Sequence, residues 1–167
     1  IAPSASAGSM RFTINSTVDA IRISGTLSMI TNQQMSFRNG TSGAAGVFRF
    51  KSGSTLITNI SASSSSYGFG SSSQSSSGWV VFESGSHLNY QGGDSPEGSG
   101  TGFSALVLEP GSIWHHRASN ATERGNFFSG QSYGDISVEN NATLTANGSV
   151  YRIGNLTVNT GCTFIAH

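Results

Sequence analysis

Residues 48–56, Phe-Arg-Phe-Lys-Ser-Gly-Ser-Thr-Leu, carry the pattern from which the fold of this 167-residue chain is predicted. Counted from Gly53, apolar residues stand at positions −5, −3 and +3, and a small residue stands at +1. Successive side chains of a β-strand point to opposite faces, so these four positions share one face. Gly53 marks a corner, because glycine tolerates a positive φ. The stretch therefore predicts two short strands joined by a bend, with one buried face.

The same pattern recurs four more times, with Gly or Asn at the corner. A tighter relative, residues 21–29, omits two residues at the bend. The corners lie 20 to 32 residues apart, and repeats of this length are typical of architectures in which each unit buries its inner face against its neighbours. We therefore expect a right-handed parallel β-helix (solenoid) of about six coils. An antiparallel β-sandwich, whose strands also alternate and turn at regular intervals, is the alternative. The five corners are Gly53, Gly85, Gly111, Asn141 and Gly161.

The repeats extend along most of the chain, so residues 1–167 are interpreted as a single β-solenoid segment. Its last residues, 156–167, follow a strand–turn–strand pattern, from which we expect the segment to belong to a longer chain. Three stretches between the repeats are predicted to be surface loops. They are residues 61–78, 91–102 and 118–134.

The composition narrows the classes of function. Charged residues make up 10% of the chain, against about a quarter in an average soluble domain. Because the net charge is zero, no basic excess is available to bind nucleic acid. One cysteine excludes an internal disulfide, and the lack of a long apolar run argues against a transmembrane span. The 35% of hydrophobic residues favours a folded core over disorder.

A column of mostly charged residues stands two positions before the corners: Lys51, Glu83, Glu109, Glu139 and Asn159. If the repeats stack in register, three carboxylates become near neighbours that repel one another. Clusters of oxygen ligands suit calcium, so Glu83, Glu109 and Glu139 are the candidate metal ligands. The other interpretation is that these side chains extend into solvent and Lys51 pairs with Glu83. No other cofactor is expected.

Histidine and cysteine offer no clear site in the sequence. His115 and His116 are adjacent, so they face opposite sides of a strand and do not bind one metal together. His87 does not stand at the same distance from its corner as His115 does. We expect surface or packing roles for all three histidines. Cys162 falls at the small inward position, where a cysteine behaves as a small hydrophobic residue. It is therefore interpreted as structural.

Aromatic residues outside the repeats are the candidate ligand contacts. Trp79 stands at the start of a predicted strand, and Tyr67 and Phe69 interrupt a serine-rich loop. Trp114, by contrast, stands at the inward +3 position, as do Leu88 and Leu144, and is expected in the core. Trp79, Tyr67 and Phe69 are therefore the candidates for contact with a sugar or a protein partner.

No catalytic residues are identified. The three aspartates, Asp19, Asp94 and Asp135, stand at different offsets from the corners. Glycoside hydrolysis needs two carboxylates facing each other at a set separation, and nothing in the pattern places such a pair. The chain is therefore not expected to be an enzyme. The alternative is a carbohydrate-active β-helix enzyme, a polysaccharide lyase or hydrolase.

Residues 134–146, Gly-Asp-Ile-Ser-Val-Glu-Asn-Asn-Ala-Thr-Leu-Thr-Ala, and residues 154–166, Gly-Asn-Leu-Thr-Val-Asn-Thr-Gly-Cys-Thr-Phe-Ile-Ala, resemble rungs of known proteins. The likeness is to the parallel β-helix rungs of large surface proteins of Bacteroidota, which are type IX secretion cargo or adhesin-like passengers. It covers residues 130–167 well and residues 45–115 loosely. It implies a secreted or cell-surface protein with a structural or adhesive role. The implied partners are a surface glycan or protein and components of the outer-membrane secretion translocon.

Overall fold

The structure is a computed structural model in which all regular secondary structure of the described residues is β-strand. The structure describes residues 10–14, 20–31, 35–39, 47–60, 80–93, 106–118, 131–146 and 151–166. The first half of the chain contributes β1 (Met10–Ile14), β2 (Ala20–Ile23), β3 (Thr26–Thr31), β4 (Met35–Asn39), β5 (Val47–Phe50), β6 (Thr55–Ile60), β7 (Val80–Phe82) and β8 (His87–Gly93). The second half contributes β9 (Leu106–Leu108), β10 (Ile113–His116), β11 (Gln131–Tyr133), β12 (Asp135–Val138), β13 (Thr143–Ala146), β14 (Tyr151–Ile153), β15 (Leu156–Val158) and β16 (Thr163–Ala166).

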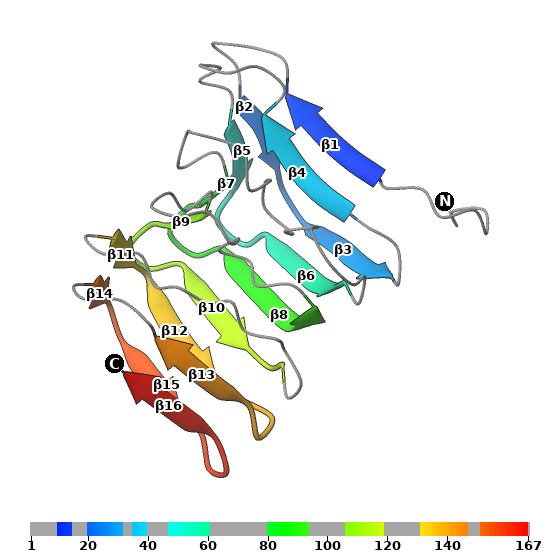
Figure 1. The fold of residues 1–167 in the computed structure, drawn as a ribbon. Coiled ribbons are helices and arrows are strands. Elements are labelled where there is room, and N and C mark those ends of the chain that lie inside the picture. The colour runs from blue at the N-terminus through cyan, green and yellow to red at the C-terminus, as the bar shows by residue number, and fades with distance from the viewer. Residues whose placement is uncertain are drawn as a thin grey trace.

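Every strand pair in the described part of the chain is parallel. One sheet has six strands in the order β15-β12-β10-β8-β6-β3, and a second has four in the order β2-β5-β7-β9. Three two-stranded sheets pair β1 with β4, β11 with β14, and β13 with β16. Figure 1 shows the strands of the large sheet side by side, from β3 in blue to β15 in orange-red. These parallel pairings do not agree with the alternative of an antiparallel sandwich.

The predicted corners are confirmed by the backbone, which adopts a positive φ at each of them. Gly25, in the tighter relative, also has a positive φ of 93°. Backbone hydrogen bonds stack the first three wide corners: Gly53 N donates to Gly85 O, and Gly85 N donates to Gly111 O, both at 2.8 Å. The φ values are 76° at Gly53, 77° at Gly85, 84° at Gly111, 57° at Asn141 and 82° at Gly161.

The expectation that all five copies of the pattern stack in one column is wrong. In the first three copies the leading strands β5, β7 and β9 lie in the four-stranded sheet, and the trailing strands β6, β8 and β10 lie in the six-stranded sheet. In the last two copies the leading strands β12 and β15 lie in the six-stranded sheet instead. The pattern therefore moves by one sheet between β10 and β12, with Trp114 aligned to Ile136.

A tight corner at Gly134 explains this shift. Asp135 N donates to Ser112 O at 2.8 Å, so the bend between β11 and β12 lies directly on the corner between β9 and β10. A Cβ added at Gly134 would approach Ser112 O to 2.5 Å, which only glycine avoids. The chain therefore enters the six-stranded sheet at Gly134. The wide corner at Asn140–Asn141 then falls at the other end of β12.

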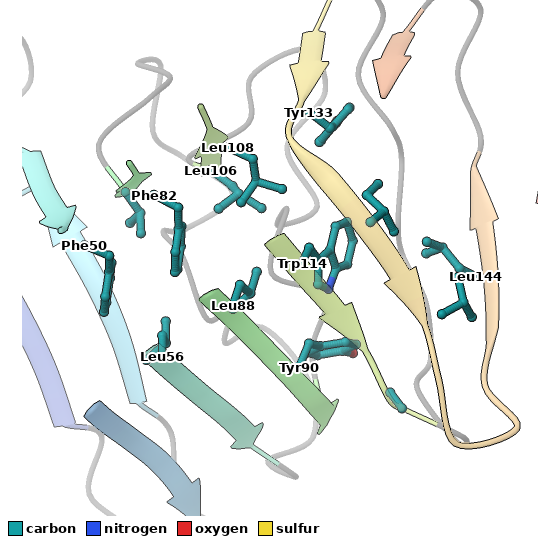
Figure 2. Packing of buried hydrophobic residues seen from close by; sticks show 14 of the residues in the cluster. Phe50, Leu56, Phe82, Leu88, Tyr90, Leu106, Leu108, Trp114, Tyr133 and Leu144 are labelled. Carbon is teal, nitrogen blue, oxygen red and sulfur yellow. The ribbon is translucent and has the colours of Figure 1, made fainter. Parts of the chain in front are cut away.

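The hydrophobic core follows the parallel register (Figure 2). Phe50 and Phe82 stack with ring centroids 4.5 Å apart and planes 4° from parallel. Trp114 is 1% exposed, which confirms its expected place in the core, although its neighbours in register are Leu88 and Ile136 rather than Leu144. One apolar side chain from each strand of the six-stranded sheet forms a column along the core. Its members are Leu27, Leu56, Leu88, Trp114, Ile136 and Leu156.

The predicted loop boundaries differ from the structure at two places. β8 continues through residues 91–93, which were assigned to the second loop. β11 occupies residues 131–133, inside the third predicted loop, and Ala118 at the start of that loop is buried. Residues 94–102 and 119–130 of these loops, and the first loop at residues 61–78, lie outside the described residues.

Candidate functional site

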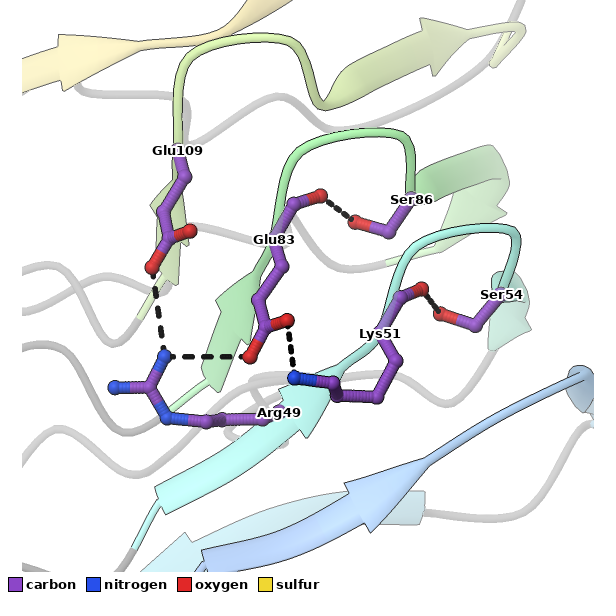
Figure 3. A network of polar contacts seen from close by, with 6 residues as sticks. All are labelled: Arg49, Lys51, Ser54, Glu83, Ser86 and Glu109. Carbon is purple, nitrogen blue, oxygen red and sulfur yellow. Dashed lines mark hydrogen bonds and ion pairs between the residues drawn. The ribbon is translucent and has the colours of Figure 1, made fainter.

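The predicted glutamate column divides into two polar clusters on the outward side of the strands. The first, the Arg49 cluster, consists of Arg49, Lys51, Glu83 and Glu109 (Figure 3). Lys51 Nζ lies 2.5 Å from Glu83 Oε2, so the expected Lys51–Glu83 pair is confirmed. Arg49 Nη1 lies 3.6 Å from Glu83 Oε1 and 3.4 Å from Glu109 Oε1. Both carboxylates therefore have cationic partners from β5 or the residue after it, Glu83 from the adjacent strand and Glu109 from two strands away.

Serine hydroxyls hold the corners beneath the Arg49 cluster. Ser54 Oγ donates to Lys51 O and Ser86 Oγ donates to Glu83 O, both at 2.6 Å. The hydrogen bond from Lys51 holds the pKa of Glu83 below its ordinary value, against the opposing effect of burial. The side chains of Arg49 and Lys51 are 35% and 40% exposed, and ion pairs at this exposure contribute only about 0–1 kcal/mol each. The ion pairs of the Arg49 cluster therefore contribute little to the free energy of unfolding.

The second group, the histidine cluster, consists of His87, His115, Arg117 and Glu139. His115 Nδ1 lies 2.7 Å from Glu139 Oε1, and Arg117 Nε donates to Glu139 Oε2 at 2.7 Å. His115 Nε2 faces His87 Nδ1 at 3.1 Å. The predicted proximity of Glu139 to Glu109 is therefore wrong. Since β12 pairs with β10, Glu139 N donates to His116 O, and the side chain lies beside His115 and Arg117.

The two imidazoles of this cluster meet edge to edge. Their planes are 20° apart and their centroids are 5.4 Å apart, which is close to the largest separation that a 3.1 Å contact between ring nitrogens allows. The Nδ1 of His87 and the Nε2 of His115 therefore point directly at each other. Since the Glu139 carboxylate accepts from Nδ1–H of His115, the Nε2 of a neutral His115 carries a lone pair and accepts from Nδ1–H of His87.

The environment fixes the charges of the histidine cluster. Burial alone would raise the pKa of Glu139, but hydrogen bonds from His115, Ser137 and Arg117 outweigh burial and lower this pKa from 4.5 to about 2. Burial lowers the pKa of His87, and the neighbouring His115 lowers it further. Glu139 is therefore ionised and His87 neutral at pH 7.

Acid is expected to remove the stabilisation that Glu139 provides. The pKa of Glu139 is lower in the folded chain than its ordinary value, so this stabilisation is present above about pH 4.5 and is lost as the pH falls toward 2. Glu139→Gln removes the titrating group, so the variant should be less stable than the native chain above about pH 5. As the pH falls from about 4.5 toward 2, the variant should lose less stability than the native chain does. Urea unfolding at a series of pH values measures both effects.

Glu109→Gln is the matched control for this experiment. The Glu109 side chain is 39% exposed, so its ion pair is screened and the substitution should cost less than about 1 kcal/mol. Equal pH profiles for Glu139→Gln and the native chain would show that the histidine cluster does not hold Glu139 ionised.

Of the other candidate residues, the aromatic ones lie outside the described ranges, whereas Cys162 and the histidines are described. Trp79, Tyr67 and Phe69 lie outside the described residues. Cys162 is partly buried and packs against the core, as its inward position predicts. His116 faces inward and is 1% exposed, whereas His115 faces outward, so the opposite orientations of this pair are confirmed. In the described ranges, no three His, Cys, Asp or Glu side chains converge as metal ligands, and no helix is long and apolar enough to cross a membrane.

Sequence reasoning missed the histidine cluster because its members have different offsets from their corners. His87 stands at +2 and His115 at +4, so the two meet diagonally across the paired strands β8 and β10. Glu139 joins them only through the one-sheet shift. In the sequence, the feature that marks this shift is a glycine in a short connection. Gly134 and Gly154 lie in the short connections that lead into β12 and β15, as Gly25 lies in the one that leads into β3, and all three strands belong to the six-stranded sheet.

Comparisons with known proteins add no relative. No family model matches the chain, and the searches of curated proteins and of solved structures found no match.

Proposed function

We propose that the chain is a non-enzymatic structural or adhesive segment of a secreted or cell-surface protein, built as a right-handed parallel β-helix. The observation that carries this proposal is the apolar column along the six-stranded sheet. At its centre Leu56, Leu88, Trp114 and Ile136 are each no more than 2% exposed, although they come from separate strands in separate repeats. In stacking of this kind, the stability of each repeat depends on its neighbours. The resulting architecture is quasi-one-dimensional, which suits a stiff scaffold.

The outward side of the strands supports a scaffold as well. The Arg49 cluster joins β5 to residues that follow β7 and β9, and the histidine cluster joins β8 and β10 to the end of β12. Each cluster thus links repeats that are distant in sequence. Ion pairs and hydrogen bonds placed in this way add contacts between repeats, while the buried apolar face and the corners set the register of the strands.

The edge strand β15 supports the proposal that this segment belongs to a longer rod. Leu156 and Val158 are 41% and 42% exposed, yet they align with Ile136 and Val138, which are 1% and 0% exposed. An uncovered edge strand with apolar side chains favours pairing with another strand. We propose that a further parallel layer covers β15 in the complete protein.

Export to the cell surface rests on the resemblance of residues 134–146 and 154–166 to rungs of Bacteroidota surface proteins. On this proposal the chain travels as cargo of an outer-membrane secretion translocon. Its surface loops then contact a glycan or a protein partner.

Fractionation of the native cells tests the proposal. An antibody against residues 1–167 should detect a band larger than 17.3 kDa in the surface or secreted fraction under denaturing conditions, and protease added to intact cells should remove it. A 17.3 kDa band in the cytosol, resistant to external protease, would contradict both the longer rod and the export.

A glycan panel separates the proposal from the enzymatic alternative. A scaffold or adhesin is expected to bind surface glycans or proteins without consuming them. Turnover of an acidic polysaccharide that is lost on substitution of Asp94 or Glu109 would support a lyase or hydrolase instead.

A further inference from the structure

Pairing of two β-strands does not require ring nitrogens to point directly at each other, as those of His87 and His115 do. Both rings lie on the outward side of the six-stranded sheet, and their facing nitrogens are 3.1 Å apart. The hydrogen bond from His115 to Glu139, and that from Arg117 to the same carboxylate, fix the ring from behind. Metal-binding histidines are commonly oriented by a carboxylate on the second ring nitrogen in this way.

We propose that His87 and His115 form a two-coordinate site for a soft monovalent cation, Cu⁺ or Ag⁺, with Glu139 as a positioning residue. Imidazole nitrogen is a good ligand for copper. A monovalent d¹⁰ ion accepts two neutral nitrogen ligands from opposite sides, and the collinear arrangement of these two nitrogens presents that geometry. The ion takes the place of the proton between the rings.

The required movement is small. Metal–imidazole bonds of about 2 Å on opposite sides of an ion place the two nitrogens about 4 Å apart, roughly 1 Å more than in the hydrogen-bonded pair. The side chains come from two neighbouring strands and are only partly buried. A retreat of about half that distance by each ring therefore opens the site without separating β8 from β10.

The protons balance without loss from the pair. His115 keeps its proton on Nδ1, where Glu139 accepts it. His87 changes tautomer, so that its proton moves by solvent exchange from Nδ1 to Nε2 and leaves a lone pair facing the ion. Both ligands stay neutral.

The surroundings favour two-coordination over a tetrahedral site. A structural zinc site takes four protein ligands, and in the described residues no third His, Cys, Asp or Glu converges with this pair. The Glu139 carboxylate accepts hydrogen bonds from His115 Nδ1 and Arg117 Nε, so it stays on the side of the His115 ring that faces away from His87. We therefore expect Cu⁺ and Ag⁺ to bind more tightly than Zn²⁺.

The test is a titration of the full chain with Ag⁺ in chloride-free buffer, followed by ¹⁵N resonances of the imidazole rings. We use the Cys162→Ser variant, because the thiol of Cys162 also binds soft cations. One equivalent of Ag⁺ should shift the Nδ1 resonance of His87 and the Nε2 resonance of His115 together. Equal shifts with Zn²⁺ at the same concentration, or a shift of one ring alone, would overturn the two-coordinate site.

Variants extend the test. Glu139→Gln should weaken Ag⁺ binding about tenfold, and His87→Gln or His115→Gln should weaken it by more. His167→Ala removes a histidine outside the pair and should leave the affinity unchanged. Circular dichroism checks that each variant folds, and the ring resonances of the chain with both histidines give the answer even if a variant does not fold. Undiminished affinity in His87→Gln and His115→Gln would contradict the proposal.

Discussion

Replacing Trp114 with alanine is expected to lower the free energy of unfolding by about 3–5 kcal/mol. The side chain is 1% exposed, and its indole contacts Tyr90 and His116 edge-on at centroid distances of 6.5 and 5.7 Å. It also fills the apolar column between Leu88 and Ile136. The truncation leaves a cavity that the paired strands cannot close, because their backbones are held in register. Urea unfolding followed by circular dichroism measures the loss.

Ile165→Ala is the control for this substitution. Ile165 is also on a β-strand, but it is 39% exposed, so its truncation should change stability by no more than about 0.5 kcal/mol. The loss expected at Trp114 is a large part of the 5–15 kcal/mol that typically stabilises a folded domain. Similar losses for the two variants would contradict the assignment of Trp114 to the centre of the core.

Replacing Gly134 with alanine is expected to destabilise the chain by up to about 3 kcal/mol, the upper end of the range for an overpacked site. The added Cβ would approach Ser112 O to 2.5 Å and Glu109 O to 2.8 Å. These are main-chain atoms, and both oxygens already accept hydrogen bonds that hold the corner. They cannot move aside as a flexible side chain would. Thermal and urea unfolding of the variant test this expectation.

Gly53→Asn is the matched control at another corner. Gly53 has a φ of 76° and nothing within 4 Å of an added Cβ, and Asn141 already occupies an equivalent corner at a φ of 57°. Asparagine tolerates this conformation, so the substitution should cost less than about 1 kcal/mol. If Gly134→Ala proved as mild as Gly53→Asn, β12 would not enter the six-stranded sheet directly over Ser112.

Local features of the fold could be predicted from the sequence because local chemistry determines them. The positive φ at Gly85 and Asn141 follows from the residue types that tolerate it, and the burial of Ser54, Ser86 and Ala142 follows from strand alternation. The parallel pairing follows from repeats that cannot bury their faces alone.

The partners of these local units could not be predicted in the same way. The same wide corner occurs at two different places in the structure: between β9 and β10 at Gly111, and between β12 and β13 at Asn141. The nine-residue pattern is identical at both places. What decides the sheet is the tight bend at Gly134, through its close approach to Ser112.

The candidate site depends on that long-range choice. Lys51 and Glu83 share one column in any stacked arrangement, so their pair was predictable. His115 and Glu139 meet only when the pattern moves by one sheet, and His87 joins them by a diagonal contact. Offsets within one repeat contain no information about either event.

The stacking of β12 on β10 underlies both the scaffold and the histidine cluster, and backbone nuclear Overhauser effects in the isotopically labelled chain test it most directly. Glu139 N donates to His116 O at 2.9 Å, so the Glu139 amide proton should show cross-peaks to backbone protons of His116 and Arg117. Cross-peaks from this amide to the backbone of Glu109 instead would mean that all copies of the pattern stack in one column, and would contradict the account.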